Sequence, residues 1–192
     1  MINSNIYSLR FRRKREERTY YKKRLTLLKS SKSRFVVRKS LNNLQASVVS
    51  YGAKGDRVMF TVDCSTLRKL GWKGGSGNLP SAYLTGLVAG KKALEMGIKE
   101  AILDLGFNKS VKGSRLYAAV AGAVNAGLII PHDPEMLPPE QRISGAHISG
   151  YAEILKKDTK KYESQFSAYL KKGFKPEEIT INFNDIKGKI HG

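Results

Sequence analysis

A chain of 192 residues with 41% hydrophobic residues is long enough to build one sizeable core with extensions. Its 35 Lys and Arg outnumber its 16 Asp and Glu, and the resulting net charge of +19 favours polyanionic partners. The single cysteine, Cys64, excludes an intramolecular disulfide and a cysteine-based zinc site, and the sequence contains no apolar run long enough to span a membrane. We therefore expect a soluble cytoplasmic protein, with Cys64 as a core residue of a strand.

The N-terminal part of the chain predicts a basic arm. From Arg10 to Lys39, fourteen Lys or Arg residues stand against two Glu, which gives this stretch a net charge of +12. Such a cluster repels itself in water and becomes ordered where a polyanion releases its condensed counterions. Phe11, Tyr20 and Tyr21 lie among these cations, and aromatic faces can stack on unpaired RNA bases. The arm lacks the continuous apolar face of an interfacial helix, so RNA is favoured over a membrane surface. RNA contact is also favoured over a solvated charged helix or a disordered basic tail.

After the arm, the period of the apolar residues changes to that of strands. Three β-rich runs follow one another: Phe35–Lys39, Leu44–Tyr51 and Asp56–Asp63. The short connections between them suit hairpin turns, so we expect three antiparallel strands. The third run is predicted to carry Val58, Phe60 and Val62 on one face.

A glycine-rich loop, residues 73–78, then leads into a predicted amphipathic helix from about Pro80 to Gly97. Residues 101–106 indicate a short buried strand, and residues 112–127 a second helix rich in Ala and Gly. Strands followed by helix, strand and helix predict an α/β fold, with a mixed, mostly antiparallel sheet covered by helices.

The last part of the chain predicts a helical extension. Four prolines between Pro131 and Pro139 enforce an extended connection. Beyond it, Ile148 to Leu155 and Tyr162 to Leu170 carry apolar residues at helical spacing among many lysines, which we interpret as packing faces. The predicted organisation is therefore a basic arm (1–30), an α/β core (31–135) and a helical C-terminal extension (136–192).

Two loops are candidates for phosphate contact. The glycine-rich loop carries Lys73 and precedes a helix, whose N-terminal N–H groups attract anions. It matches neither common nucleotide-binding consensus, so a structural turn and an RNA contact are equal alternatives there. The second loop, residues 112–115, adds Lys112 and Arg115, and phosphate contact is the favoured interpretation.

The sequence does not indicate catalysis. Asp63 and Asp104 end predicted strands and could together hold Mg²⁺ for phosphodiester cleavage, but no third acid is evident and a structural role is favoured. The three histidines, His132, His147 and His191, form no triad or dyad pattern. We therefore expect no catalytic residue, no metal and no cofactor. A Mg²⁺-dependent nuclease and a membrane-surface protein are the alternatives.

Several motifs, in order along nearly the whole chain, resemble a known family. They are Phe11 to Glu16 with Thr19, Tyr21 and Arg24; Arg34 to Ser40; Leu70 to Gly74; Gly77 to Leu87; Lys112 to Arg115; Ile130 to His132; and Gly145 to Ile148. Together they resemble the large-subunit ribosomal protein numbered eighteen in bacteria and archaea and five in eukaryotes, most closely in its archaeal form. Two positions depart from the family pattern: Glu17 replaces a glycine and Tyr20 an aspartate, which adds a stacking surface.

The resemblance implies a non-enzymatic constituent of the large ribosomal subunit. It would bind 5S rRNA and help attach it to the large-subunit rRNA in the central protuberance, beside another 5S-binding ribosomal protein. The predicted rRNA-binding residues come from the arm, one strand and the two loops. They are Arg10, Arg12, Arg13, Lys14, Arg15, Arg18, Tyr20, Tyr21, Arg24, Arg34, Arg38, Lys73, Lys112 and Arg115.

Overall fold

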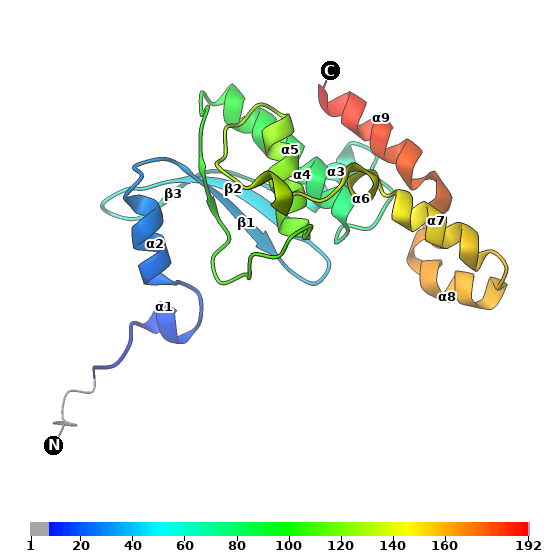
Figure 1. Ribbon diagram of the computed structural model, residues 1–192, viewed down its shortest axis with the longest axis horizontal. Helices are drawn as coiled ribbons and strands as arrows, with labels where there is room; N and C mark the ends of the chain where they lie inside the picture. Colours follow the sequence, from blue (N-terminus) through cyan, green and yellow to red (C-terminus); the bar gives the residue numbers. More distant parts are fainter. Residues whose placement is uncertain (1–7, 192) are drawn as a thin grey trace.

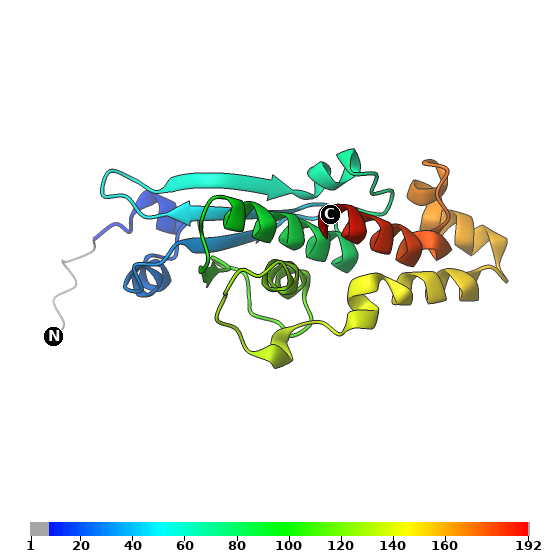
Figure 2. The same ribbon diagram turned by 90° about the horizontal axis from the view of Figure 1, so that it is seen from above.

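The computed structural model describes residues 8–191, so residues 1–7 of the predicted arm and residue 192 of the predicted extension lie outside the described residues. The molecule is an elongated α/β protein, with the basic arm at one end and the C-terminal helices at the other (Figures 1 and 2). The principal helices are α1 (Arg12–Arg15), α2 (Tyr21–Leu28), α3 (Cys64–Lys69), α4 (Leu79–Glu95), α5 (Arg115–Asn125), α6 (Glu140–Ser144), α7 (Ala146–Leu155), α8 (Thr159–Leu170) and α9 (Ile179–His191). Short 3-10 helices, η1 (Pro134–Met136) and η2 (Pro176–Glu178), lie in the connections.

The sheet has four strands in the order β3-β2-β1-β4. They are β1 (Arg34–Lys39), β2 (Leu44–Ser50), β3 (Arg57–Asp63) and β4 (Ile102–Asp104). The first three form antiparallel hairpins, and β4 pairs with β1 in parallel after the crossover through α4. The predicted mixed, mostly antiparallel sheet covered by helices is confirmed.

One prediction about β3 is wrong. Phe60 and Val62 are buried on the core face, whereas Val58 is 56% exposed. The register between β2 and β3 shifts between Val48 and Val49, so that Val48 pairs with Phe60 and Val49 with Val58. This bulge inserts one extra residue into β3 and turns Val58 to the opposite face of the sheet.

Helices α4 and α5 pack against each other on one side of the sheet (Figure 1). Their backbones approach closely at two glycines. A Cβ atom on Gly86 would lie 1.9 Å from the Ala119 carbonyl oxygen, and one on Gly122 would lie 2.0 Å from that of Tyr83. The small residues of α5 therefore serve mainly the contact between the two helices.

The turn after β3 differs from the prediction. Cys64 is buried, but it begins α3 and does not belong to a strand. Asp63 is the N-cap of α3, and its carboxylate accepts hydrogen bonds from the backbone N–H groups of Ser65 and Thr66. The hydrogen bond from the Ser65 hydroxyl is the main cause that lowers the pKa of Asp63. Asp63 is thus a structural acid.

Among the C-terminal helices, α9 contributes the most buried side chains to the core, although the spacing of apolar residues did not single it out. Phe183 packs on Tyr83 of α4 with 5.6 Å between ring centroids. Ile179 and Ile186 are buried in the same apolar cluster as the sheet and α4. The buried side chains of the predicted helical extension therefore pack in the same apolar cluster as those of the predicted α/β core.

Candidate nucleic-acid interface

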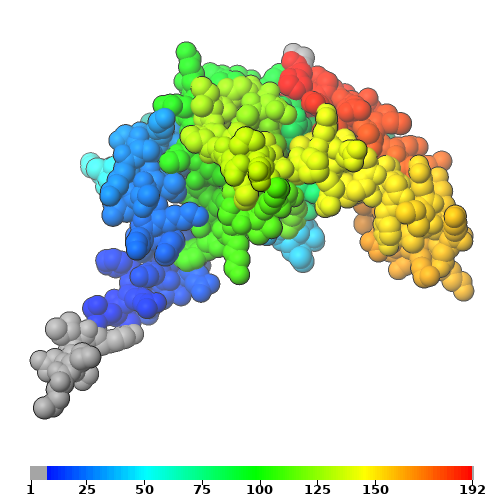
Figure 3. All heavy atoms as spheres, viewed as in Figure 1, coloured from blue at the N-terminus to red at the C-terminus, as the bar shows by residue number. Residues whose placement is uncertain are grey.

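The arm presents its cations on α1. All four residues of this helix, Arg12 to Arg15, are exposed, and the helix buries none of its side chains. In the space-filling view the arm projects from the body of the molecule (Figure 3). Glu16 lies between two guanidinium groups, 2.9 Å from Arg12 Nε and 3.2 Å from Arg18 Nε. Exposed pairs of this kind contribute little stability, so these arginines can exchange Glu16 for phosphate at small cost.

The turn after α1 has a left-handed backbone conformation at Glu17, the position where the family pattern described above has a glycine. Glu17 has φ +52°, in the left-handed region, and the turn is closed by the N–H groups of Arg18 and Thr19, which donate to the carbonyl of Arg13. A residue with a Cβ atom is disfavoured there by about 1–2 kcal/mol. Glu17 therefore forms this turn at the expense of local backbone strain.

We expect Glu17→Gly to relieve this strain and to strengthen the turn by about 0.5–1 kcal/mol, because glycine loses more chain entropy on ordering and this offsets part of the gain. Hydrogen exchange of the Arg18 and Thr19 amides should slow by a factor of a few. Glu17→Gln is the matched control, because it removes the same charge and keeps the strain. Equal protection in the two variants would show that the charge, and not the backbone, limits the turn.

The three aromatic rings of the arm pack on other rings and remain partly open to solvent. Phe11 packs on Tyr21 with ring centroids 5.3 Å apart, which links the start of α1 to α2. Tyr20 packs on Phe107, from the loop after β4, at 5.8 Å. Tyr20 and Tyr21 remain 45% and 37% exposed. Their outer faces are therefore available for base stacking.

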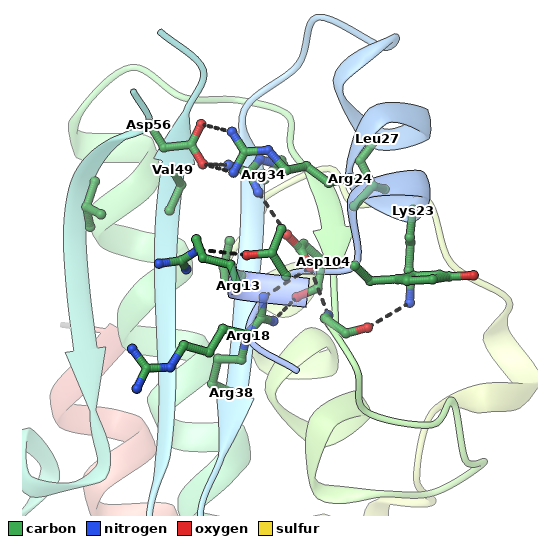
Figure 4. Close-up of a pocket in the computed structure, with 15 residues that line it drawn as sticks. Arg13, Arg18, Lys23, Arg24, Leu27, Arg34, Arg38, Val49, Asp56 and Asp104 are labelled. Atoms are coloured by element: carbon green, nitrogen blue, oxygen red, sulfur yellow. Dashed lines mark hydrogen bonds and ion pairs between the residues drawn. The ribbon is translucent and has the colours of Figure 1, made fainter. Parts of the chain in front are cut away.

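Helix α2 lies on the sheet face opposite the α4–α5 layer, and a cleft of about 220 Å³ separates it from the strands (Figure 4). Leu27 of α2 and Val58 of β3 are among the apolar residues of its wall. Six cationic side chains also line it: Arg13, Arg18, Lys23, Arg24, Arg34 and Arg38. The structure thus brings residues of the arm and of β1, both predicted to bind rRNA, to one surface.

Two acids neutralise part of this charge. Arg34 is only 5% exposed, and its guanidinium contacts Asp56 and also Asp104, whose Oδ2 is 2.9 Å from Arg34 Nη1. Arg38 donates to Asp104 Oδ1 at 3.2 Å and to the Asp104 carbonyl at 2.7 Å. Arg24 pairs with Asp56. We therefore assign Arg34 to this ion-pair network and leave it out of the surface proposed for RNA.

Asp104 is ionised in this network. Burial opposes its charge, but Arg38, the N–H of Gly106 and Arg34 outweigh that effect and hold the pKa of the Asp104 carboxyl below its ordinary value. Its partners are cations, while Asp63 caps α3, so each acid already has its own structural role. Within residues 8–191, His, Cys, Asp and Glu form no cluster of three or more that could hold a metal ion.

Sequence reasoning missed Asp56, because it had been read only as the first residue of the third predicted strand, at the end of a hairpin turn. The available signal was weak: one acid in a short turn of a strongly basic chain. Its partners Arg24 and Arg34 are 32 and 22 residues away along the chain. Only the pairing of the strands brings them together.

Lys73, Lys112 and Arg115 do not line the cleft. The loop that contains Lys73 is held by α8, since the N–H of Gly75 donates to Tyr169 Oη at 3.1 Å. Arg115 Nη1 donates to the Gly77 carbonyl at 2.6 Å, and Lys112 Nζ lies 3.2 Å from Glu135. These contacts favour the structural interpretation of the glycine-rich loop.

Two further observations bear on the partner. Among the helices of residues 8–191, none combines the length and apolar character needed to cross a membrane.

A family model described as ribosomal large subunit proteins 60S L5 and 50S L18 matches residues 5–100, which is half of the chain. The match contains the whole described arm, β1 to β3 and α4, and therefore most of the cationic cleft.

Proposed function

Because this chain belongs to the family of large-subunit ribosomal proteins that includes 60S L5 and 50S L18, we propose that it binds 5S rRNA and helps attach it to large-subunit rRNA in the central protuberance. The family is one of ribosomal structural proteins and not of enzymes. The protein is accordingly an RNA-binding component of the large ribosomal subunit. We further propose a neighbouring 5S-binding ribosomal protein as its partner there, which the resemblance of the sequence supports.

One observation carries the proposal of 5S binding: the exposed cations of the arm lie beside partly exposed aromatic rings, and α2 attaches this part of the chain to the sheet. The proposed contacts of this surface are Arg10, Arg12, Arg13, Lys14, Arg15, Arg18, Tyr20 and Tyr21. Guanidinium groups suit bidentate contact to phosphate, and tyrosine rings suit looped-out bases. Charge and shape would then matter more than recognition of base edges.

The remaining predicted residues take secondary places in the proposal. Arg24 and Arg38 hold the arm and the loop after β4, and their outer edges adjoin the RNA surface. Lys73 and Lys112 have exposed side chains and stay proposed contacts on a separate face, whereas Arg115 is engaged with backbone carbonyls.

The test is binding of the purified protein to 5S rRNA across a salt series, with an unrelated structured RNA of equal length as competitor. We expect 5S binding to persist at salt concentrations that abolish binding of the competitor, because only the non-specific part of the affinity is purely electrostatic. Equal affinity for both RNAs at every salt concentration would contradict the proposal and leave a general RNA-binding surface.

A further inference from the structure

We propose that Asp56 is a positioning residue for RNA binding: it fixes the basic arm on the sheet through Arg24, although its own charge opposes RNA. This inference rests on the proposed function, since it concerns how the same surface is prepared for its ligand. Asp56 belongs to the turn between β2 and β3, and Arg24 belongs to α2 (Figure 4).

The Arg24–Asp56 pair has the geometry of a strong contact. Arg24 Nη2 lies 2.8 Å from Asp56 Oδ1, and Nη1 lies 2.8 Å from Oδ2, so the two groups form a bidentate pair. Their side chains are 32% and 20% exposed, in contrast to the largely exposed Arg12 and Arg18 beside Glu16. Bidentate, partly buried pairs are directional and stronger than exposed ones.

Asp56 is itself held in place from the core side. The buried guanidinium of Arg34 contacts Asp56 and, at 2.9 Å, Asp104 of β4. A continuous chain of ion pairs therefore runs from α2 through the β2–β3 turn to β1 and β4. Because Arg34 is fixed on the central part of the sheet, the carboxylate of Asp56 is oriented before α2 meets it.

The position of α2 depends on such contacts, because α2 contains no fully buried residue. Apolar burial alone therefore stabilises its docking only weakly. The other polar tether is longer: Lys23 Nζ lies 3.4 Å from the Gly106 carbonyl oxygen. The Arg24–Asp56 pair is thus the firmest polar contact between α2 and the sheet.

The position of the arm's proposed phosphate-binding groups on α1 depends on the position of α2. Helix α1 buries no residue and is linked to α2 by the contact of Phe11 with Tyr21. If α2 is loose, α1 must be ordered during RNA binding, and this ordering reduces the observed affinity. A fixed α2 removes part of that cost before the ligand arrives.

The sign of one substitution separates positioning from general electrostatics. Removing an acid beside a cationic surface should strengthen RNA binding if charge alone matters. If Asp56 positions the arm, Asp56→Asn should instead raise the Kd for 5S rRNA by about tenfold, since freeing α2 restores its ordering cost. Amide hydrogen exchange in α2 should also become faster in the free variant.

The control is Asp185→Asn, which makes the same change of charge at an exposed position on α9, away from the arm (Figure 1). We expect its Kd to match that of the wild type or to fall slightly. Binding by Asp56→Asn that is unchanged or tighter would overturn the positioning role. Failure of the wild-type protein to bind 5S rRNA selectively would instead refute the proposed function, so the two failures are distinguishable.

A second variant tests the same contact in case Asp56→Asn does not fold. Arg24→Gln breaks the same contact from the arm and leaves Asp56 paired with Arg34 in the sheet. In a double-mutant cycle, the positioning role predicts that Arg24→Gln adds little to the loss already caused by Asp56→Asn. Fully additive losses would mean that Arg24 contacts RNA independently and would overturn the inference. If Asp56→Asn does not fold, Arg24→Gln alone must both weaken RNA binding and speed amide hydrogen exchange in α2. Exchange as slow as in the wild type would overturn the positioning role.

Discussion

Replacing Arg12, Arg13 and Arg15 together with Ala is expected to weaken binding to 5S rRNA on the order of a hundredfold in 0.1 M salt. Each phosphate contact contributes roughly 0.7–0.9 to the slope of log K against log salt, so the slope should become shallower by about two to three. These arginines are exposed on a helix that buries no residue, so truncation should leave the core intact. Filter binding or fluorescence anisotropy over a salt series measures both quantities.

A charge-matched control distinguishes the arm from net charge. Lys171, Lys172 and Lys175 are exposed and directly follow α8, which lies at the end of the molecule opposite the arm (Figure 1). Their replacement by Ala also removes three positive charges. If the arm is the contact surface, this variant should retain most of the salt slope. Equal slopes for the arm variant and the wild type would count against direct contact by α1.

Asp104→Asn is expected to lower the free energy of unfolding by about 3–5 kcal/mol. The carboxylate of Asp104 is shared by the buried Arg34 and by Arg38, and it also accepts a hydrogen bond from the N–H of Gly106 at 2.8 Å. The neutral amide leaves the buried Arg34 charge with only Asp56 to compensate it. Urea denaturation followed by circular dichroism provides the measurement. A loss below about 1 kcal/mol would show that water or a neighbouring group replaces the carboxylate.

The same network predicts how stability depends on pH. The pKa of Asp104 is lower in the folded state than its ordinary value near 3.9. Its contribution is therefore fully present above that value and is lost as the pH falls through the lower, folded-state pKa. The wild type should lose stability more steeply than Asp104→Asn on acidification below about pH 4. Parallel pH profiles for the two proteins would show that Asp104 does not carry this linkage.

Local patterns in the sequence were sufficient for most elements of the fold. The β-rich runs Phe35–Lys39 and Leu44–Tyr51 predicted strands, and the structure places β1 and β2 there. Helix α4 begins next to Pro80, and Gly97 follows it with φ +77°, where the helix was expected to end. Such features depend on residues within a few positions of each other, which is why sequence alone reveals them.

The sequence also determined the chemical character of the arm. Fourteen Lys and Arg between Arg10 and Lys39, with aromatics among them, indicate a polyanionic partner whatever the fold. The ordered motifs resembled a ribosomal family, and the family match confirms that resemblance. Charge density and motif order do not require knowledge of tertiary contacts, because they are properties of the chain itself.

Only the tertiary structure decided which of these cations remain available. Arg34 and Arg12 look alike in the sequence, yet one is buried between Asp56 and Asp104 and the other is exposed. The bulge that turns Val58 toward the arm is likewise a property of the pairing of β2 with β3. Arg34 and Asp104 are 70 residues apart, and the parallel pairing of β1 with β4 places them within 3 Å. Ion pairs and strand register depend on such distant contacts, which no local pattern in the sequence encodes.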